Sequence, residues 1–347
     1  MIKYLGSKRS MMPQLTALAA ASGAKSALDL FTGTTRVAQM LKGLGMHTTA
    51  VDVASYSEVF AKTWIELDAS SVQANELDDA IAHLNALPPV DGFFTQEYCV
   101  KARYFQPKNG QRVDAAREAI ERDYRSSWLY FPLLSALILA ADRVDSTTGV
   151  QMAYLKDWAR RSHAELTIQN PRLLPGVGSA IRGDALELAP LLPEVELAYL
   201  DPPYNQHRYF GNYHVWESLV RWDNPEGYGI ANKRIDTRHS DNKSPFNSKT
   251  TMPAALAEVI AGLRCETLVL SYNNEAWLSR DELIDLCAPK GHVVAFEVDS
   301  KRYVGSQIGI YNKSGDLVGK PSHQRNTEYL IMAGDKTRIR RMLNALK

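Results

Sequence analysis

The chain has 347 residues, of which 45% are hydrophobic and 23% are charged, a composition that is ordinary for a globular protein. Its length exceeds that of one small domain and predicts either a large domain with an insertion or two domains. The formal net charge of +1 excludes a general polycation, so any surface for nucleic acid must come from local clusters of cations.

The three cysteines, Cys99, Cys265 and Cys287, are far apart in the sequence and form no CxxC pair. Neither a zinc site nor a disulfide framework is therefore expected, and a reducing cytoplasm fits this cysteine usage best. The first residues lack the apolar core of a signal peptide, and no long apolar run predicts a membrane span. We therefore expect a cytoplasmic protein with no bound metal and no membrane contact.

The beginning of the chain predicts a strand, a helix and a second strand. SALDLF at 26–31 predicts a short buried strand, and the following residues predict a turn and an amphipathic helix that ends near Gly45. HTTAVDV at 47–53 predicts a second strand that ends near Asp52. This order is typical of the first βαβ unit of a doubly wound nucleotide-binding sheet, so the expected fold class is α/β and Rossmann-like.

The middle of the chain differs, because residues 68–178 predict helices without strand alternation. Strands and helices alternate again later, with strands predicted within 180–192 and at 195–201, 266–273, 292–298 and 328–334. The sequence therefore predicts one α/β domain, formed by residues 1–67 and 179–347, that is interrupted by a helical insert at 68–178. A polar, aromatic-rich stretch at 207–249 predicts little regular structure, and long loops of this kind are often functional.

Three residues near predicted strand ends are candidates for ligand binding. Gly33 lies in the first βα turn, where a glycine lets the backbone approach a ligand, although it is equally compatible with a tight connection. Asp52 ends the second predicted strand, where an acid can accept hydrogen bonds from ribose hydroxyls or cap a helix. Asp184 follows the third predicted strand, where it could meet an adenine amino group or cap the next helix.

The stretch AYLDPPYN at 198–205 carries the strongest chemical signal. An apolar strand would deliver Asp201 to the carboxyl edge of the sheet, which is where open α/β sheets bind ligands. Pro202 and Pro203 fix the backbone, so that the carbonyl of Pro202 is held beside the Asp201 carboxylate. Two fixed acceptors suit a planar amino group, and Tyr204 offers a face on which a planar base could stack.

These motifs resemble those of the adenine-specific DNA methyltransferases, which use S-adenosylmethionine and modify the exocyclic N6. YLGSK at 4–8, DLFTGTT at 29–35 and DPPY at 201–204 resemble the family's N-terminal, cofactor and catalytic motifs in the alpha-type order. The run DPPYNQHRYFGNYHVWE at 201–217 resembles methyltransferases of type IIS restriction-modification systems. Thr35 departs from the family's second glycine, and a residue other than glycine can fit at this position if its φ is negative.

The resemblance implies roles for two groups of residues. The residues expected around S-adenosylmethionine are Tyr4, Lys8, Asp29, Phe31, Gly33, Asp52 and Asp184. The residues expected to hold the target adenine are Asp201, Pro202, Pro203 and Tyr204. Hydrogen bonds from N6–H to acceptors would make the amine more nucleophilic, and an adenine inside a duplex would have to flip out to reach them.

Double-stranded DNA is the expected partner, and the helical insert is expected to recognise the target. Cations gather near 101–125, 232–249 and 301–320, although any one of them could be an ordinary surface charge. The predicted DNA-binding residues are Lys101, Arg103, Arg112, Tyr213, Lys233, Arg234, Lys243 and Lys313. A cognate restriction endonuclease is a candidate partner, and the chain is expected to be a monomer or a weak dimer near the bacterial nucleoid. Two alternatives stay open: an RNA adenine methyltransferase, and a catalytically silent DNA-binding protein on the same scaffold.

Overall fold

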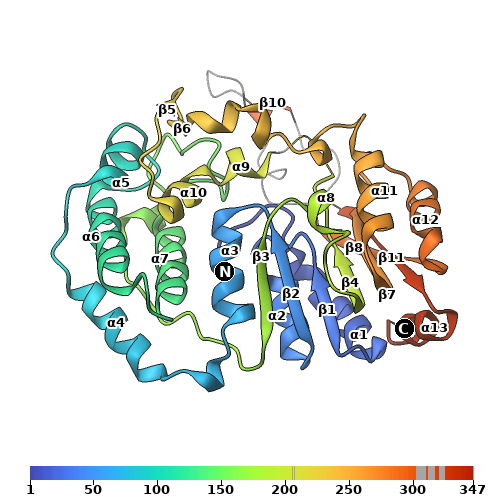
Figure 1. Cartoon of the computed structure of the whole chain (residues 1–347). Coiled ribbons are helices and arrows are strands. Elements are labelled where there is room, and N and C mark those ends of the chain that lie inside the picture. The colour runs from blue at the N-terminus through green and yellow to red at the C-terminus, as the bar shows by residue number, and fades with distance from the viewer. Residues whose placement is uncertain (205, 207, 302–309, 312–316, 320–324, 347) are drawn as a thin grey trace.

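The computed structural model describes residues 1–204, 206, 208–301, 310–311, 317–319 and 325–346. A seven-stranded sheet lies at its centre (Figure 1). The strand order is β3-β2-β1-β4-β7-β11-β8, and β11 alone runs antiparallel to its neighbours. The strands are β1 (Ser26–Asp29), β2 (His47–Asp52), β3 (Gly178–Arg182), β4 (Val195–Leu200), β7 (Cys265–Asn273), β8 (His292–Lys301) and β11 (Arg325–Gly334). The predicted α/β fold with a doubly wound sheet is therefore confirmed.

Helices cover both faces of the sheet. Successive side chains of a strand point to opposite faces, so neighbouring residues of one strand belong to different cores. On β4, Leu197 and Tyr199 enter one core, whereas Ala198 and Leu200 enter the other. The first core is closed by α1 (Met12–Ser22), α2 (Arg36–Gly43) and α13 (Lys336–Asn344). The second is closed by α8 (Ala185–Leu188), α11 (Met252–Gly262) and α12 (Arg280–Cys287). Burial on both faces explains why the central strands β4 and β7 contain consecutive apolar residues in the sequence.

The long connection between β2 and β3 is helical, and it lies at one end of the sheet in Figure 1. It begins with α3 (Ser55–Ala61) and continues through α4 (Ala74–Ala86), α5 (Phe93–Thr95), α6 (Pro107–Tyr124) and α7 (Tyr130–Val144). A third core runs without interruption through α3, α7 and the later helix α10 (His214–Arg221), with Phe60, Leu137 and Trp216 among its members. The insert is thus packed on the same core as its neighbours.

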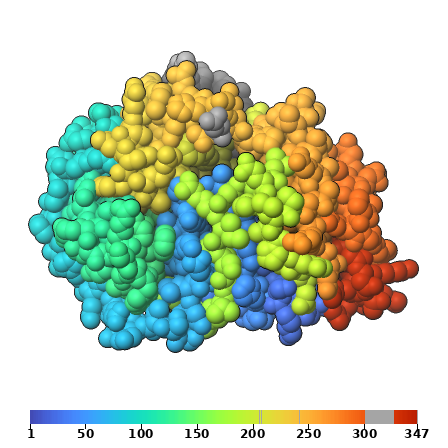
Figure 2. Space-filling model, viewed as in Figure 1, coloured from blue at the N-terminus to red at the C-terminus, as the bar shows by residue number. Residues whose placement is uncertain are grey.

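The segment after β4 has more regular structure than its sequence predicted. It forms α9 (Tyr209–Asn212), α10, and a two-stranded hairpin of β5 (Gly227–Tyr228) and β6 (Lys233–Arg234). Short helical turns follow, at η6 (Ile235–Arg238), η7 (Ser240–Asn242) and η8 (Pro245–Asn247). In Figure 2 this yellow segment lies across the top of the molecule, from the cyan insert to the orange helices.

The remaining helical segments and strands are short. The other short helical segments are η1 (Lys8–Met11), η2 (Lys62–Glu66), η3 (Ala69–Ser71), η4 (Gln96–Val100), η5 (Arg160–His163) and η9 (Ala288–Lys290). β9 (Ile310–Tyr311) and β10 (Leu317–Gly319) pair antiparallel, and residues 312–316 between them lie outside the described residues. Within the described ranges, no helix is long and apolar enough to cross a membrane.

Candidate active site

A cavity of about 240 Å³ opens at the carboxyl ends of β1, β2, β3 and β4. Parallel strands end together at this edge, so residues that are far apart in the sequence share one wall. Seven of the predicted site residues line the cavity: Tyr4, Phe31, Asp52, Asp184, Asp201, Pro203 and Lys243. The yellow segment after β4 covers it, and a hollow is visible beneath that segment in Figure 2.

Gly33 shapes the first βα turn without lining the cavity itself. Its φ is +50°, and an added Cβ would lie 3.0 Å from the ring of Tyr4, so the turn requires glycine for two reasons. The Gly33 N–H donates to Oδ2 of Asp52 over 2.8 Å. The turn, the Tyr4 ring and the Asp52 carboxylate therefore form one rigid unit.

Thr35 occupies a left-handed conformation, with φ of 61° and ψ of 15°. The negative φ that would let a residue other than glycine fit here without strain is therefore not present. A β-branched residue in this region costs on the order of 1–3 kcal/mol of strain. Hydrogen bonds hold it there, because its N–H donates to the Thr32 carbonyl over 2.7 Å and its Oγ1 accepts from Gln39 over 2.9 Å.

Asp29 lies beneath the turn rather than on the cavity wall. Its Oδ2 accepts hydrogen bonds from Thr32 Oγ1 over 2.8 Å and from the Ala38 N–H over 3.0 Å, which ties β1 to α2. The other oxygen, Oδ1, is buried without a hydrogen-bond partner among the described residues. Burial raises the pKa of Asp29 to about 7.

Asp52 and Asp184 are both engaged by backbone N–H groups and both line the cavity. Asp52 accepts from Gly33 through Oδ2 and from Ala54 through Oδ1, over 2.8 and 3.0 Å, and burial raises its pKa. Asp184 caps α8 by accepting from the Leu186 N–H over 2.8 Å. The capping role foreseen for Asp184 is therefore present, and lone pairs on both acids are left for a ligand.

Asp201 ends β4 and faces Lys8, whose Nζ lies 2.9 Å from its Oδ1. The same ammonium lies 3.5 Å from Oε2 of Glu328, whose Oε1 accepts from Asn273 over 2.8 Å. Burial raises the pKa of Asp201 to about 6, although Lys8 acts in the opposite direction. Lys8 was expected among the cofactor residues, whereas here its ammonium contacts the carboxylate of the DPPY motif.

The rest of the DPPY motif is packed against the sheet edge. Pro202 is buried, and the ring of Tyr204 lies 5.4 Å from that of Tyr272 on β7. The Lys8 ammonium lies 5.8 Å from the centre of the Tyr204 ring. Lys8 thus contacts both the acid and the aromatic residue of the motif.

Tyr213 is fully buried, which removes it from the outer surface where DNA contacts were predicted. Its ring stacks on Tyr4 with centroids 4.7 Å apart, and its hydroxyl accepts from the Leu5 N–H over 2.6 Å. Tyr56 and Tyr209 pack around the same Tyr4 ring. This aromatic cluster fixes the N-terminal segment against the cavity.

Arg234 is also buried, with only 1% of its side chain exposed. It forms ion pairs with Asp223 at 2.6 Å and with Asp236 at 2.8 Å, and these acids raise its pKa against the effect of burial. A guanidinium that is enclosed and neutralised in this way cannot reach a phosphate in this conformation. The structure therefore assigns Arg234 to packing within the segment after β4.

The other predicted DNA-binding residues have varied surroundings. Lys101 is exposed and pairs with Glu97 at 2.5 Å, and Arg103 donates to the Lys156 carbonyl while lying 4.7 Å from the Trp158 ring. Arg112 donates to the carbonyls of Leu166 and Asn85. Lys233 is half-buried, Lys243 is exposed on the cavity wall, and Lys313 lies outside the described residues.

Several cavity residues were not singled out from the sequence. They are Tyr56, Arg182, Arg208, Tyr209, Phe210, Glu217, Arg221, Asn242, Ser244, Phe246 and Asn247. Most belong to the polar, aromatic-rich stretch after β4, and the available signals were its composition and the motif run at 201–217, which includes Tyr209 and Glu217. Among the described residues, no cluster of His, Cys, Asp or Glu has the arrangement of a metal site.

The sequence matches known proteins over most of its length. A family model described as D12 class N6 adenine-specific DNA methyltransferase matches residues 4–284. The chain is 29% identical to Modification methylase StsI of Streptococcus sanguinis over 304 residues, which make up 82% of this chain and 46% of that protein. It is 28% identical to Type II methyltransferase M.NlaIII of Neisseria lactamica over 319 residues, or 87% of this chain and 92% of that protein.

A third relative shows a similar pattern of coverage. Type II methyltransferase M.FokI of Planomicrobium okeanokoites is 24% identical over 310 residues, which make up 84% of this chain and 47% of that protein. The chain thus spans about half the length of StsI and M.FokI and nearly all of M.NlaIII.

Proposed function

The chain belongs to the D12 class N6 adenine-specific DNA methyltransferase family, and from this premise we propose that it methylates the N6 of an adenine in a specific double-stranded DNA sequence. We further propose S-adenosylmethionine as the methyl donor, which supplies an electrophilic methyl group on a sulfonium. The observation that carries the proposal is the shared cavity, where Asp201 stands on one wall with the acids Asp52 and Asp184.

The cavity has features that fit this cofactor. Asp52 suits the ribose hydroxyls, because a carboxylate that already accepts backbone N–H groups is held in place and keeps further acceptor capacity. Asp184 suits the adenine amino group, and Phe31, which lies 5.2 Å from Phe246, offers an apolar ring surface. Tyr4 closes the side of the cavity next to Gly33.

The target adenine would be held by the DPPY motif. In our proposal Asp201 and the Pro202 carbonyl accept the two N6–H groups, so that the nitrogen lone pair turns toward the methyl group. Lys8 keeps the Asp201 carboxylate in one position, 2.9 Å from its ammonium. Methyl transfer then forms the N–CH₃ bond, breaks the S–CH₃ bond and releases one N6 proton. Positioning and fixed dipoles would supply the acceleration, and no covalent enzyme intermediate is needed.

The DNA surface would include Lys243 and the cations of the helical insert at 68–178. An adenine must leave the duplex to reach Asp201, at a cost of a few kcal/mol, and contacts to the phosphates would offset that cost. Lys243 supports this arrangement because it is exposed and lies on the cavity wall. Three relatives are named as modification or type II methyltransferases, which supports a cognate restriction endonuclease as the biological partner.

The experiment that tests the proposal measures transfer of a tritiated methyl group from S-adenosylmethionine to unmethylated genomic DNA. Chromatography of the digested product should recover the label in N6-methyladenine. Asp201→Ala should lower turnover by about 100- to 1000-fold while DNA binding in a gel-shift assay is retained. Label in another base, or transfer to RNA in place of DNA, would contradict the proposal. Near-normal turnover by the variant would contradict the role of Asp201.

A further inference from the structure

Glu217 is a buried acid on the cavity wall that the proposed mechanism does not use. It belongs to α10, only 1% of the residue is exposed, and it lines the same cavity as Asp52 and Asp201. Burial raises its pKa. An acid enclosed to this degree carries a large desolvation cost, so its position on a ligand cavity calls for a chemical explanation.

Two neighbouring backbone N–H groups bring Glu217 next to Asp52. The N–H of Ala54 donates to Oδ1 of Asp52 over 3.0 Å, and the next N–H, of Ser55, donates to Oε1 of Glu217 over 2.7 Å. Because the two donors are adjacent in the chain, both carboxylates are tied to the turn where α3 begins, and both line the cavity. They come from different parts of the chain, since Asp52 ends β2 and Glu217 lies on α10.

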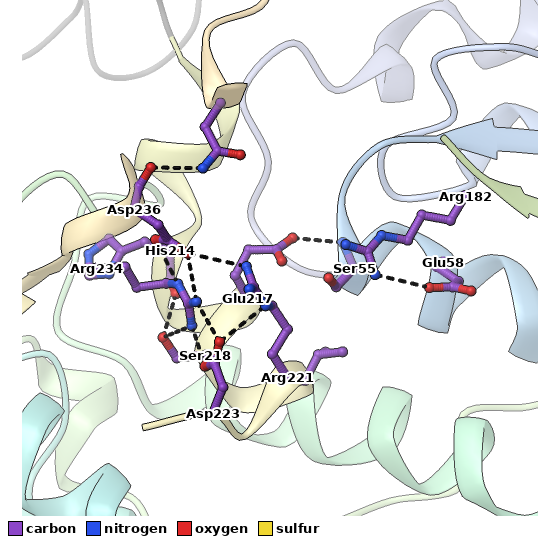
Figure 3. A network of polar contacts seen from close by, with 12 residues as sticks. Ser55, Glu58, Arg182, His214, Glu217, Ser218, Arg221, Asp223, Arg234 and Asp236 are labelled. Atoms are coloured by element: carbon purple, nitrogen blue, oxygen red, sulfur yellow. Dashed lines mark hydrogen bonds and ion pairs between the residues drawn. The ribbon is translucent and has the colours of Figure 1, made fainter. Parts of the chain in front are cut away.

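The buried Arg234 holds α10 in place on the side of the helix opposite Glu217. Figure 3 shows Glu217 pointing from α10 toward Ser55, while Arg234 lies on the other side of the same helix. Arg234 donates to Oγ of Ser218 over 3.2 Å, and Asp223 and Asp236 hold its guanidinium. The residue before Ser218 is therefore held in a defined place, as a ligand-binding acid must be.

The Glu217 carboxylate keeps acceptor capacity in this arrangement. Oε1 accepts the Ser55 N–H over 2.7 Å, and the Ser55 hydroxyl lies against the same carboxylate. The two oxygens of a carboxylate offer about four acceptor sites, so Glu217 can also accept from a ligand group in the cavity. Ribose carries two adjacent hydroxyls, both of which are donors, and two carboxylates on one cavity wall match that pair.

We propose that Glu217 is a cofactor-binding residue that accepts a hydrogen bond from one ribose hydroxyl while Asp52 accepts one from the other. This proposal rests on the proposed function, because it takes S-adenosylmethionine as the occupant of the cavity. It adds an acid from the segment after β4 to the acid at the end of β2. The segment that covers the cavity would therefore also bind the cofactor.

The test uses S-adenosylhomocysteine, which has the same ribose and does not react, together with its 2′-deoxy and 3′-deoxy analogues. Titration calorimetry would measure the Kd of each for the wild type and for Glu217→Gln. The glutamine keeps an oxygen for the Ser55 N–H and loses the second carboxylate acceptor, so stability should be unchanged. Glu217→Gln should weaken binding of the ribose compound about tenfold, and this loss should be absent with one of the two deoxy analogues.

The matched control is Glu66→Gln, in the segment that follows α3. Glu66 pairs with Lys62 at 2.7 Å and neither residue lines the cavity, so its variant should bind like the wild type. Binding by Glu217→Gln that equals the wild type would overturn the proposal, as would an equal loss for all three ligands. The wild type alone gives a further test, since indifference to both deoxy analogues would also overturn it. If the wild type bound neither S-adenosylhomocysteine nor S-adenosylmethionine, the proposed function would be contradicted as well.

Discussion

The ammonium of Lys8 and the carboxylate of Asp201 form a 2.9 Å ion pair between the N-terminal segment and the end of β4. Only 6% of the Lys8 side chain is exposed, so this pair is screened little by solvent. Asp201 and Glu328 raise the pKa of Lys8 well above its usual value against the effect of burial. The acid of the DPPY motif is thus held by a permanently charged partner.

Replacing Lys8 should change the pH dependence of methyl transfer. The pKa of Asp201 is about 6, so activity should rise as pH increases through about 6 and level off above it, where the carboxylate is ionised. Lys8→Met removes the charge that favours ionisation, so the midpoint should move to higher pH and activity at pH 7 should fall about tenfold or more. The measurement is kcat against pH, with Lys8→Arg as the control that keeps the charge. A midpoint that does not move in Lys8→Met would contradict the role of the pair.

Asp29→Asn should alter the pH dependence of stability. A carboxyl whose pKa is about 7 in the folded state and near 4 in the unfolded state binds its proton more tightly when folded. Its contribution to the free energy of unfolding is therefore greatest at low pH and is lost as pH rises through about 7. The loss is at most about 4 kcal/mol, which corresponds to a difference of about three pKa units. The asparagine variant should lack this loss and be more stable than the wild type at pH 8. Urea unfolding at several pH values would check this, and parallel curves for the two proteins would refute it.

Gly33→Ala should weaken cofactor binding and stability together. The positive φ disfavours alanine by about 1 kcal/mol, and the new methyl group would press on the Tyr4 ring. Displacement of Tyr4 should also disturb its stacking on Tyr213. Calorimetric titration and thermal unfolding would measure both effects. Gly43→Ala is the control, because a Cβ there meets nothing within 4 Å and alanine favours the helix.

Lys243 and Arg234 should behave in opposite ways although both lie in one cation-rich stretch. Lys243→Ala should weaken DNA binding and lower the slope of log K against log salt by about 1, with little change in stability. Arg234→Met should destabilise the protein by about 3–5 kcal/mol, because it leaves Asp223 and Asp236 without their buried partner. Filter binding at several salt concentrations and urea unfolding separate the two outcomes. An unchanged salt slope in Lys243→Ala would remove it from the DNA surface.

The sequence predicted the sheet and one wall of the site because both depend on local signals. The apolar run before Asp201 predicts a buried strand, and the carboxyl edge of a parallel sheet then collects Asp52, Asp184 and Asp201. The resemblance to an adenine-specific methyltransferase family was confirmed by the family model over residues 4–284. The roles assigned to single residues stay predictions.

The sequence could not predict the features of the site that depend on contacts between residues far apart in the chain. Arg234 and Lys243 look alike in the sequence, and only the positions of Asp223 and Asp236 bury the first. Glu217 meets the turn after Asp52 only once α10 packs on α3, although 165 residues separate the two acids in the chain. The left-handed backbone of Thr35 is sustained by Thr32 and Gln39, and a sequence pattern has no signal for such strain.

The core that joins the insert to α3 and α10 would limit how the target recognition proposed for the insert could be exchanged between relatives. A chimaera that replaced residues 68–178 alone would divide that core, since Leu137 would come from one parent and Phe60 and Trp216 from the other. A workable transplant must carry the insert together with both helices, and α10 takes Glu217 and the Arg234 cluster with it. Under the roles proposed for the insert and for Glu217, target recognition and cofactor binding would be inherited as one unit, and new specificities would arise mainly by substitution on the surface of the insert.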